Sequence, residues 1–360
     1  MGKNMRKKYM DNIRWMTVVL VVLYHVVYMF NGVETAGVIG PFSETQYQDA
    51  FQYIVYPWFM LLLFVVSGAC ARYYLENHTH KEFIKSRTRK LLVPSTIGLF
   101  VFQWILGYYN MQISGAFDSM GSSVPGFAFY LIMAVSGTGV LWYIQMLWVF
   151  SVLLVLFRSV EKDRLFNLCK KVNVPVLLGL SAAVWGMAQC LNTPVIVVYR
   201  FGIYGTGFLI GYLCISHGEV MERLQGWWAP LTLSAVLLGA AFMVCYWGKP
   251  YAEHEILDTP LCNVFAWITV LAVLAFMKKW GDFENRCTVW MGRKAWGLYI
   301  FHYLPLAACA WHLTSGGKQI PAIYVYPAVL TAAFAGAFLL NECISRIPVV
   351  RWCVLGIRKE

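Results

Sequence analysis

The sequence predicts an all-α polytopic membrane protein with about ten transmembrane helices, and three observations lead to this fold class. Hydrophobic residues make up 59% of the 360 residues and charged residues only 13%, whereas soluble domains contain roughly 45–50% and about 25%. The apolar residues occur in runs close to the length of about 20 residues that a membrane-spanning helix requires. The 15 Trp, 21 Tyr and 23 Phe residues fit the enrichment of aromatic side chains at bilayer interfaces.

The apolar runs form one continuous series without a linker. We therefore expect residues 1–360 to form a single integral membrane domain. The longest connection, 110–138, is rich in Gly and Ser, and we expect it to be an outer loop that could cover an extracytoplasmic opening. The expected spans are 13–30, 51–75, 91–109, 139–157, 174–190, 195–215, 229–247, 261–277, 288–310 and 322–345.

The distribution of positive charge predicts that both termini are cytoplasmic. If the N-terminus is cytoplasmic and the spans alternate, all but three of the 29 Lys and Arg residues fall on the cytoplasmic side or at its boundary, as the positive-inside rule requires. The exceptions are Arg200, Lys249 and Lys318. The net charge of +11 is thus explained by topology, and we expect no nucleic-acid partner.

The ten cysteines indicate neither a disulfide framework nor a zinc site. None lies in a Cys-x-x-Cys pair, and most fall inside apolar runs, where cysteine behaves as a small hydrophobic residue. We therefore expect no bound metal.

The first span carries two ionisable residues, Arg14 and His25, on one helix face. Their separation of eleven residues corresponds to about three turns and about 16 Å along the axis. Arg14 is then expected near the cytoplasmic surface and His25 near the bilayer centre. An ionisable side chain at that depth must face the bundle interior or a cavity, and it is a candidate functional residue. The alternative is a neutral histidine that only bridges helices by hydrogen bonds.

A second histidine, His302, is expected at a comparable depth in the ninth span. It follows Lys294 by eight residues, which places it about 12 Å from the cytoplasmic side. The two histidines could converge on one site, or they could make unrelated helix contacts.

Other basic residues allow two interpretations each. The segment KEFIKSRTRKLLVP before the third span either holds a cytoplasmic loop in place or binds a phosphate-rich ligand, for which Arg and Lys are suited. Arg200, near the outer end of the sixth span, either snorkels to the interface or contacts an anionic group of an extracytoplasmic substrate.

Five motifs, in order along the chain, resemble those of the membrane acyltransferase-3 family, which O-acylates cell-surface polysaccharides, glucans and related acceptors. The Arg14-x10-His25 pair resembles the signature of the family's first span. The later motifs are MLLLFVVSGA with Ser67, SRTRKLLVPSTIG with Arg87 and Lys90, LWYIQMLW with Trp142 and Tyr143, and GRKAWGLYIFHYLP with Tyr299 and His302.

The resemblance implies a cytoplasmic acyl-CoA donor, most often acetyl-CoA, and a hydroxyl acceptor that we expect to be a carbohydrate. It implies O-acetylation in polysaccharide modification of the cell envelope, by a multi-pass protein of a bacterial-type plasma (inner) membrane. The residues expected to hold the phosphates of the donor are Arg14, Arg72, Arg87, Arg89 and Lys90.

His25 is expected to act as general base on the acceptor hydroxyl. The alternative is that His25 becomes acylated and passes the group on, which we favour less because the general base needs only one positioned imidazole. The candidate donors to the oxyanion of the thioester are Trp142, Tyr143, Tyr299 and His302. The expected acceptor contacts are Ser67, Trp142 and Arg200.

Two other classes of protein remain as alternatives. A transporter or flippase also places His and Arg within the membrane, but it usually shows inverted repeats with broken helices, and no such symmetry is apparent in this sequence. A non-catalytic membrane module is the third hypothesis, and the presence of Arg14, His25 and His302 weighs against it.

Overall fold

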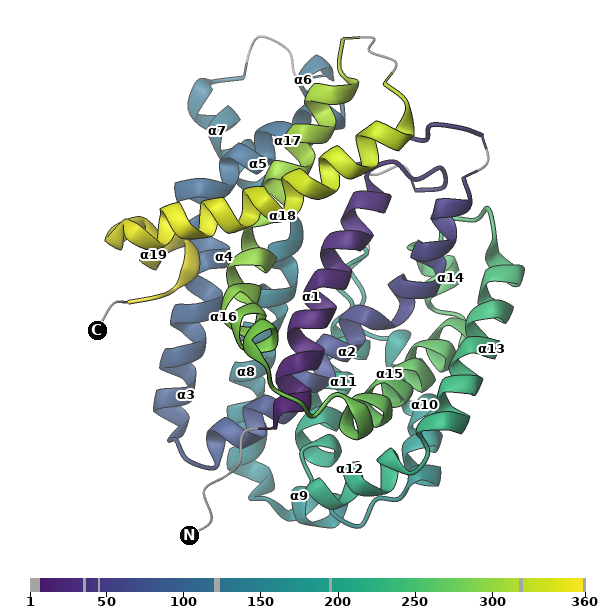
Figure 1. Cartoon of the computed structure of the whole chain (residues 1–360). Helices are drawn as coiled ribbons and strands as arrows, with labels where there is room; N and C mark the ends of the chain where they lie inside the picture. The colour runs from purple at the N-terminus through teal and green to yellow at the C-terminus, as the bar shows by residue number, and fades with distance from the viewer. Residues whose placement is uncertain are drawn as a thin grey trace. The chain divides into compact units, whose positions relative to one another are not determined.

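The computed structural model describes residues 7–34, 37–44, 46–119, 124–193, 196–316 and 320–358, and the regular elements in these ranges are all helices (Figure 1). The chain divides into two units. Unit 1 comprises Met1–Val19, Tyr53–Phe83 and Val149–Ala295, and unit 2 comprises Leu20–Gln52, Ile84–Trp148 and Trp296–Glu360. The predicted all-helical fold class is confirmed.

Within the described residues, seven helical segments are long and apolar enough to cross a membrane, which identifies a multi-pass membrane protein. They are Lys8–Tyr28 (α1), Tyr47–Leu75 (η1, Tyr47–Asp49, and α2, Ala50–Leu75), His80–Ile113, Gly139–Glu161 (η4, Gly139–Leu141, and α8, Trp142–Glu161), Trp228–Tyr246 (α13), Pro260–Trp280 (α15) and Ala322–Arg346 (α18).

Three further apolar helical segments are shorter. They are Gly126–Ser136 (α7), Val174–Ala188 (α10) and Phe201–Ile215 (α11, Phe201–Ile210, and η5, Gly211–Ile215). The other helices are α6 (Ala116–Ser119), α9 (Arg164–Cys169), α12 (Gly218–Gln225), α14 (His254–Leu257), α16 (Arg286–Phe301), α17 (Tyr303–Thr314) and α19 (Pro348–Leu355).

The segment expected as the third span is longer than the sequence predicts. Helix starts at His80 rather than near residue 91, and it continues through π-helical turns to Ile113; the parts are α3 (His80–Arg87), η2 (Thr88–Leu92), α4 (Val93–Gly98), η3 (Leu99–Gln103) and α5 (Trp104–Ile113). The charged stretch before residue 91 therefore belongs to the helix. The expected outer loop 110–138 contains the end of α5 and the helices α6 and α7.

In unit 1, the apolar helix α15 is the centre of packing. It lies against α10, α12 and α13, and the indole of its Trp267 donates a hydrogen bond of 2.7 Å to the carbonyl of Leu177 in α10. Gly68 of α2 allows close approach to α11, because a Cβ atom there would lie 1.9 Å from the carbonyl oxygen of Phe208. The Ser67–Gly68 motif thus has a packing role at its glycine.

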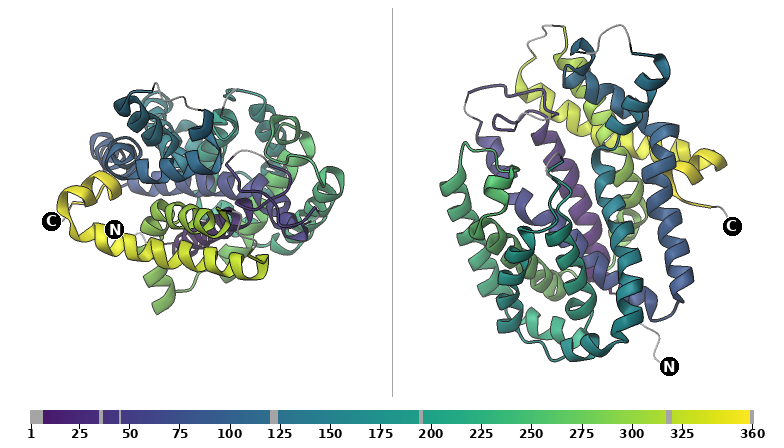
Figure 2. Two further views of the ribbon diagram at one scale, coloured as in Figure 1. Left: turned by 90° about the horizontal axis from the view of Figure 1, so that it is seen from above. Right: turned by 180° about the vertical axis from the view of Figure 1, so that it is seen from behind.

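In unit 2, α17 packs against α5 and α18, and α5 packs against α7. Gly107 permits the contact of α5 with α7, since a Cβ atom there would lie 1.7 Å from the carbonyl oxygen of Met133. Helix α19 packs against α4 and follows α18 at the yellow, C-terminal end of the chain (Figure 2).

The expected span 288–310 is divided at His302, where α16 ends and α17 begins. Pro305 explains this division. Proline has no backbone N–H and its ring collides with the carbonyl four residues earlier, which here belongs to Phe301. The interruption places His302 at the junction of α16 and α17.

Candidate active site

The histidines His25 and His302 meet in unit 2. His25 lies on α1, His302 lies at the junction of α16 and α17, and His302 Nε2 is 3.2 Å from His25 Nδ1. The ring centroids are 5.2 Å apart. His302 has 0% exposed surface, whereas His25 is partly exposed. His25 is therefore the more exposed of the two rings.

The hydrogen bonds of His302 determine which ring nitrogens carry protons. Its Nδ1 lies 3.0 Å from the carbonyl oxygen of Leu298 and 2.9 Å from that of Tyr299. Because carbonyl oxygens only accept, Nδ1 of His302 is the protonated nitrogen and Nε2 of the neutral ring is the acceptor. His25 must then donate from its own Nδ1, which leaves the lone pair of His25 on Nε2.

Tyrosine rings surround the two imidazoles. The ring of Tyr303 is 4.9 Å from that of His25 in an edge-to-face arrangement, and the ring of Tyr299 is 6.4 Å from that of His302. Tyr299 donates its hydroxyl hydrogen to the carbonyl of Val140. Tyr143, on α8, lies 5.8 Å from Tyr299 between ring centroids. The adjacent Trp142 is partly exposed.

Arg14 lies on the same helix as His25, eleven residues before it. Its side chain is 56% exposed and forms an ion pair of 3.7 Å with Asp11 on the preceding turn. The neighbouring Asn12 is buried, and its amide donates to the carbonyls of Gly281 and Phe283 at 2.8 and 2.9 Å. Asn12 therefore anchors the start of α1, and Arg14 presents an accessible cation.

The basic residues before the third expected span differ in accessibility. Arg87 ends α3 and is half-buried, Arg89 lies half-buried on η2, and Lys90 is exposed. The Nε atom of Arg89 is buried and has no hydrogen-bond partner among the described residues. A helix carrying several cations at adjacent positions suits a ligand with several phosphate groups.

Arg72, in unit 1, is already neutralised by other side chains. Its guanidinium forms ion pairs with Asp163 at 2.6 Å and Glu76 at 3.5 Å and stacks 3.5 Å above the ring centroid of Phe166. The residue is only 8% exposed. The hydroxyl of Tyr212 lies 3.2 Å from it. These contacts indicate a structural role within unit 1.

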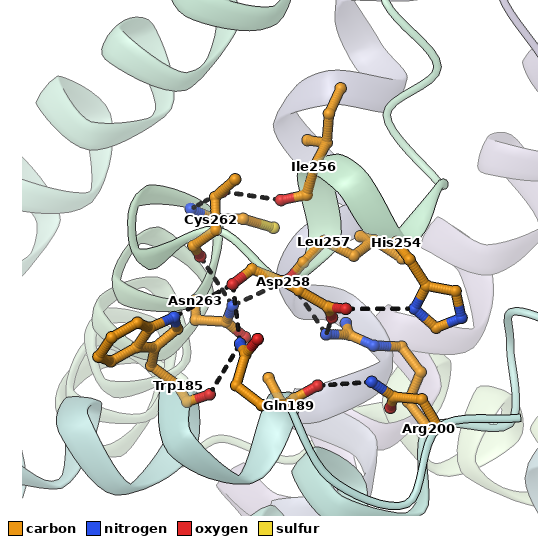
Figure 3. A network of polar contacts seen from close by, with 12 residues as sticks. Trp185, Gln189, Arg200, His254, Ile256, Leu257, Asp258, Cys262 and Asn263 are labelled. Carbon is orange, nitrogen blue, oxygen red and sulfur yellow. Dashed lines mark hydrogen bonds and ion pairs between the residues drawn. The ribbon is translucent and has the colours of Figure 1, made fainter.

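Arg200 is also paired within unit 1. Its Nη2 donates to the carbonyl of Leu257 at 3.1 Å and to the carboxylate of Asp258 at 3.0 Å, and the residue is 4% exposed. Figure 3 shows the Asp258 carboxylate between Arg200 and His254, whose Nδ1 lies 3.4 Å away. The guanidinium is thus buried in a protein network and does not snorkel.

A comparison with protein families covers nearly the whole chain. Residues 7–342 match the family model described as an acyltransferase domain, acyltransferase 3. The chain belongs to the membrane acyltransferase-3 family. No curated protein and no solved structure is significantly similar to it. Its family membership shows an acyltransferase in general terms, and the predicted resemblance is confirmed.

The members of the acyltransferase site that the sequence indicated fall into two sets. Unit 2 brings together His25, His302, Tyr299 and Tyr143, whereas Arg14, Ser67, Arg72 and Arg200 belong to unit 1. Within the described residues, no group of three His, Cys, Asp or Glu side chains is placed to hold a metal ion.

Sequence reasoning missed Tyr303 and the carbonyl of Val140. Tyr303 directly follows His302, and its contact with His25 depends on the turn between α16 and α17. The signal that could have indicated this turn is Pro305, two residues further on. The contact of Val140 with Tyr299 is made by its main chain, so its side chain gave no signal.

Proposed function

We propose that the protein transfers an acyl group, an acetyl group in the simplest case, from acyl-CoA to a hydroxyl of a carbohydrate acceptor, with His25 as general base. The single observation that carries the proposal is the contact between His25 Nδ1 and His302 Nε2. It holds the imidazole of His25 with its basic nitrogen, Nε2, directed away from His302. The acyltransferase family supports this chemistry over transport or flipping of a substrate.

The proposed step balances with one imidazole. Nε2 of His25 takes the proton of the acceptor hydroxyl while that oxygen bonds to the thioester carbonyl carbon. The tetrahedral intermediate collapses, the carbon–sulfur bond breaks, and its electron pair leaves with sulfur. The thiolate then takes the proton from Nε2. The products are an ester and free CoA, and His25 returns to its starting state.

His302 is a positioning residue in this mechanism. When His25 is protonated, its Nδ1–H donates to His302 Nε2 and shares the positive charge with the neutral ring. His302 is itself polarised by the two carbonyls that accept from its Nδ1. The role resembles that of the third member of a catalytic triad, which holds the base in one tautomer.

The oxyanion needs donors that are not already committed to carbonyl groups. The hydroxyl hydrogen of Tyr299 is given to Val140, and Nδ1–H of His302 is given to the main chain. Of the four expected donors, Tyr299 and His302 are therefore weaker candidates for this role than the sequence suggests.

For the donor, we propose that accessible cations bind the phosphates of acyl-CoA. Arg87, Arg89 and Lys90, which follow one another closely in unit 2, form one candidate set, and Arg14 on α1 is a separate candidate. We leave out Arg72, which is paired with Asp163 and Glu76. If the N-terminus is cytoplasmic, Arg14 marks the cytoplasmic end of α1 and His25 lies about 16 Å further into the membrane. That separation suits a donor whose phosphates and thioester are joined by a long arm.

We leave Arg200 out of the proposed acceptor site. An anionic acceptor would have to displace Asp258, which binds the same guanidinium at 3.0 Å. Removing one member of a buried ion pair leaves the other charge uncompensated. The proposed protein is a multi-pass enzyme of a bacterial-type plasma membrane that acts on a cell-envelope carbohydrate.

The test uses purified protein in lipid nanodiscs with acetyl-CoA labelled in the acetyl group. Acyl transfer and thioester hydrolysis are measured for the wild type, for His25→Ala and for the matched control His312→Ala, which removes an exposed histidine on α17. We expect loss of turnover in His25→Ala alone. A well-folded wild type that neither binds nor turns over any acyl-CoA would refute the proposal.

The alternative of an acyl-His25 intermediate is tested separately. Single-turnover reactions are quenched and the protein is analysed by mass spectrometry for a labelled adduct on His25. Its accumulation before acceptor is added would replace the general base by covalent catalysis, and turnover without any adduct supports the base.

A further inference from the structure

Gln52, in the first turn of α2, is buried without partners. It is 0% exposed, yet neither Oε1 nor Nε2 of its amide makes a hydrogen bond with any residue that the structure describes. An amide offers one acceptor and two donor hydrogens, and leaving them unpaired in the interior lowers stability. A native group with this cost requires an explanation.

Asp49 lies three residues earlier, on the same face of the helical segment. Its Oδ2 accepts from the backbone N–H of Gly32 at 3.0 Å, and its Oδ1 lies 3.4 Å from Nε2 of Gln46. The Gln46 amide also donates to the carbonyl of Phe30 at 2.7 Å. These contacts hold the chain after α1 in place. A carboxylate has about four lone-pair positions, so Asp49 can accept further hydrogen bonds.

Tyr326, in the first turns of α18, adds a second unpaired polar group. Its hydroxyl is buried and has no hydrogen-bond partner in the described part of the chain. Its ring contacts Phe30, whose carbonyl accepts from the Gln46 amide beside Asp49. The ring of Tyr326 packs against those of Phe30 and Phe42 at centroid distances of 5.4 and 5.7 Å. Unused hydrogen-bonding groups therefore lie beside aromatic rings.

These groups select one class of ligand. The carboxylate of Asp49 disfavours anions. A metal ion would need more ligands than this one carboxylate, and no metal-holding group is found in the described residues. A neutral ring with several hydroxyls offers donors to the carboxylate, donors and acceptors to the amide and phenol, and C–H groups to the aromatic rings.

We propose that Asp49, Gln52 and Tyr326, which we name the outer polar cluster, bind a sugar ring of the acceptor. The cluster belongs to unit 2, as do His25 and His302. Phe30, which contacts Tyr326, follows His25 by five residues, just beyond the end of α1 at Tyr28. The inference rests on the proposed function, because it assigns the acceptor side of the same reaction.

Binding is measured on the full-length protein in nanodiscs without acyl-CoA. The probes are the methyl glycosides of glucose, galactose, rhamnose and N-acetylglucosamine, and saturation-transfer NMR reports their dissociation constants. The variants are Gln52→Leu and Tyr326→Phe. The matched controls are Gln48→Leu and Tyr324→Phe, which change exposed residues near the same positions.

We expect at least one glycoside to bind the wild type and each cluster variant to bind it about five- to tenfold more weakly, the effect of losing one or two hydrogen bonds. The controls should bind as the wild type does. Gln52→Leu should melt no lower than the wild type, because it replaces an unpaired amide by an apolar side chain of similar size. That result separates a binding role from a structural one.

The inference is overturned if no glycoside binds the wild type, or if both cluster variants bind as tightly as the wild type. Hydrolysis of acetyl-CoA by the same samples separates the two proposals. Normal hydrolysis without glycoside binding refutes the outer polar cluster alone. Glycoside binding that depends on Gln52 and Tyr326, in a protein that does not turn over any acyl-CoA, supports the cluster as a sugar site and refutes the acyltransferase mechanism.

Discussion

Replacing His302 by phenylalanine tests the mechanism most directly. The phenyl ring fits a site with no exposed surface, but it cannot accept the hydrogen bond that His25 Nδ1 makes at 3.2 Å. In the transition state this bond involves a protonated His25, and hydrogen bonds to charged groups contribute about 1.5–3 kcal/mol. We expect kcat to fall about 10- to 150-fold, with little change in KM for acetyl-CoA.

The double variant provides the decisive comparison. His25→Ala removes the base and should lower kcat by about 10²- to 10⁴-fold. If His302 acts only through His25, adding His302→Phe to His25→Ala lowers kcat no further. His302→Gln, whose amide has both a donor and an acceptor, should recover part of the rate. Independent, multiplying effects of the two single variants on acyl transfer would refute the reasoning.

Three other predictions concern residues outside the histidine pair. Arg14→Ala should raise KM for acyl-CoA about two- to fivefold without changing kcat, the size expected for one exposed ion pair; initial rates at varied donor concentration measure this, and a fall in kcat alone would contradict it. Arg200→Ala should destabilise the protein by about 3 kcal/mol, because it leaves Asp258 without its partner; an unchanged melting temperature in nanodiscs would exclude the buried pair. The thiol of Cys214 lowers the pKa of Cys169 to about 7, so Cys169 should be about half thiolate at pH 7. Cys214→Ala should therefore slow the alkylation of Cys169 by iodoacetamide about tenfold. Equal alkylation rates in the variant and the wild type would refute the contact between the two thiols.

Much of the helical fold could be predicted from the sequence, because long stretches of high hydropathy indicate helices that are surrounded by lipid rather than water. The long apolar runs of α2, α13 and α15 coincide with expected spans. Hydropathy failed where the helix is charged or short. The helix from His80 begins in a basic stretch, and α7 has only 11 residues, fewer than a span requires. Both are stabilised by tertiary packing, which a window average does not report.

The histidine pair could be anticipated from depth, since residue counts along two helices placed His25 and His302 at similar levels. Their actual contact depends on the helix junction before Pro305, which residue counts do not describe. The partner of Arg200 could not be predicted either, because Asp258 lies 58 residues away in the sequence. One unusual cation in a span did not reveal that its charge is neutralised by a distant acidic residue.

The junction at His302 has a consequence for how mutations affect the chemistry. The acceptors that fix the proton on Nδ1 are main-chain oxygens of residues 298 and 299, so exchanging either side chain leaves them in place. The backbone geometry thus determines the tautomer of His302, and through the contact of the two rings it determines the tautomer of His25. Side-chain substitutions around the histidine pair are therefore tolerated as long as the helix backbone stays in place. A distant substitution that shifts the turn before Pro305 would inactivate His25 although it does not contact that residue.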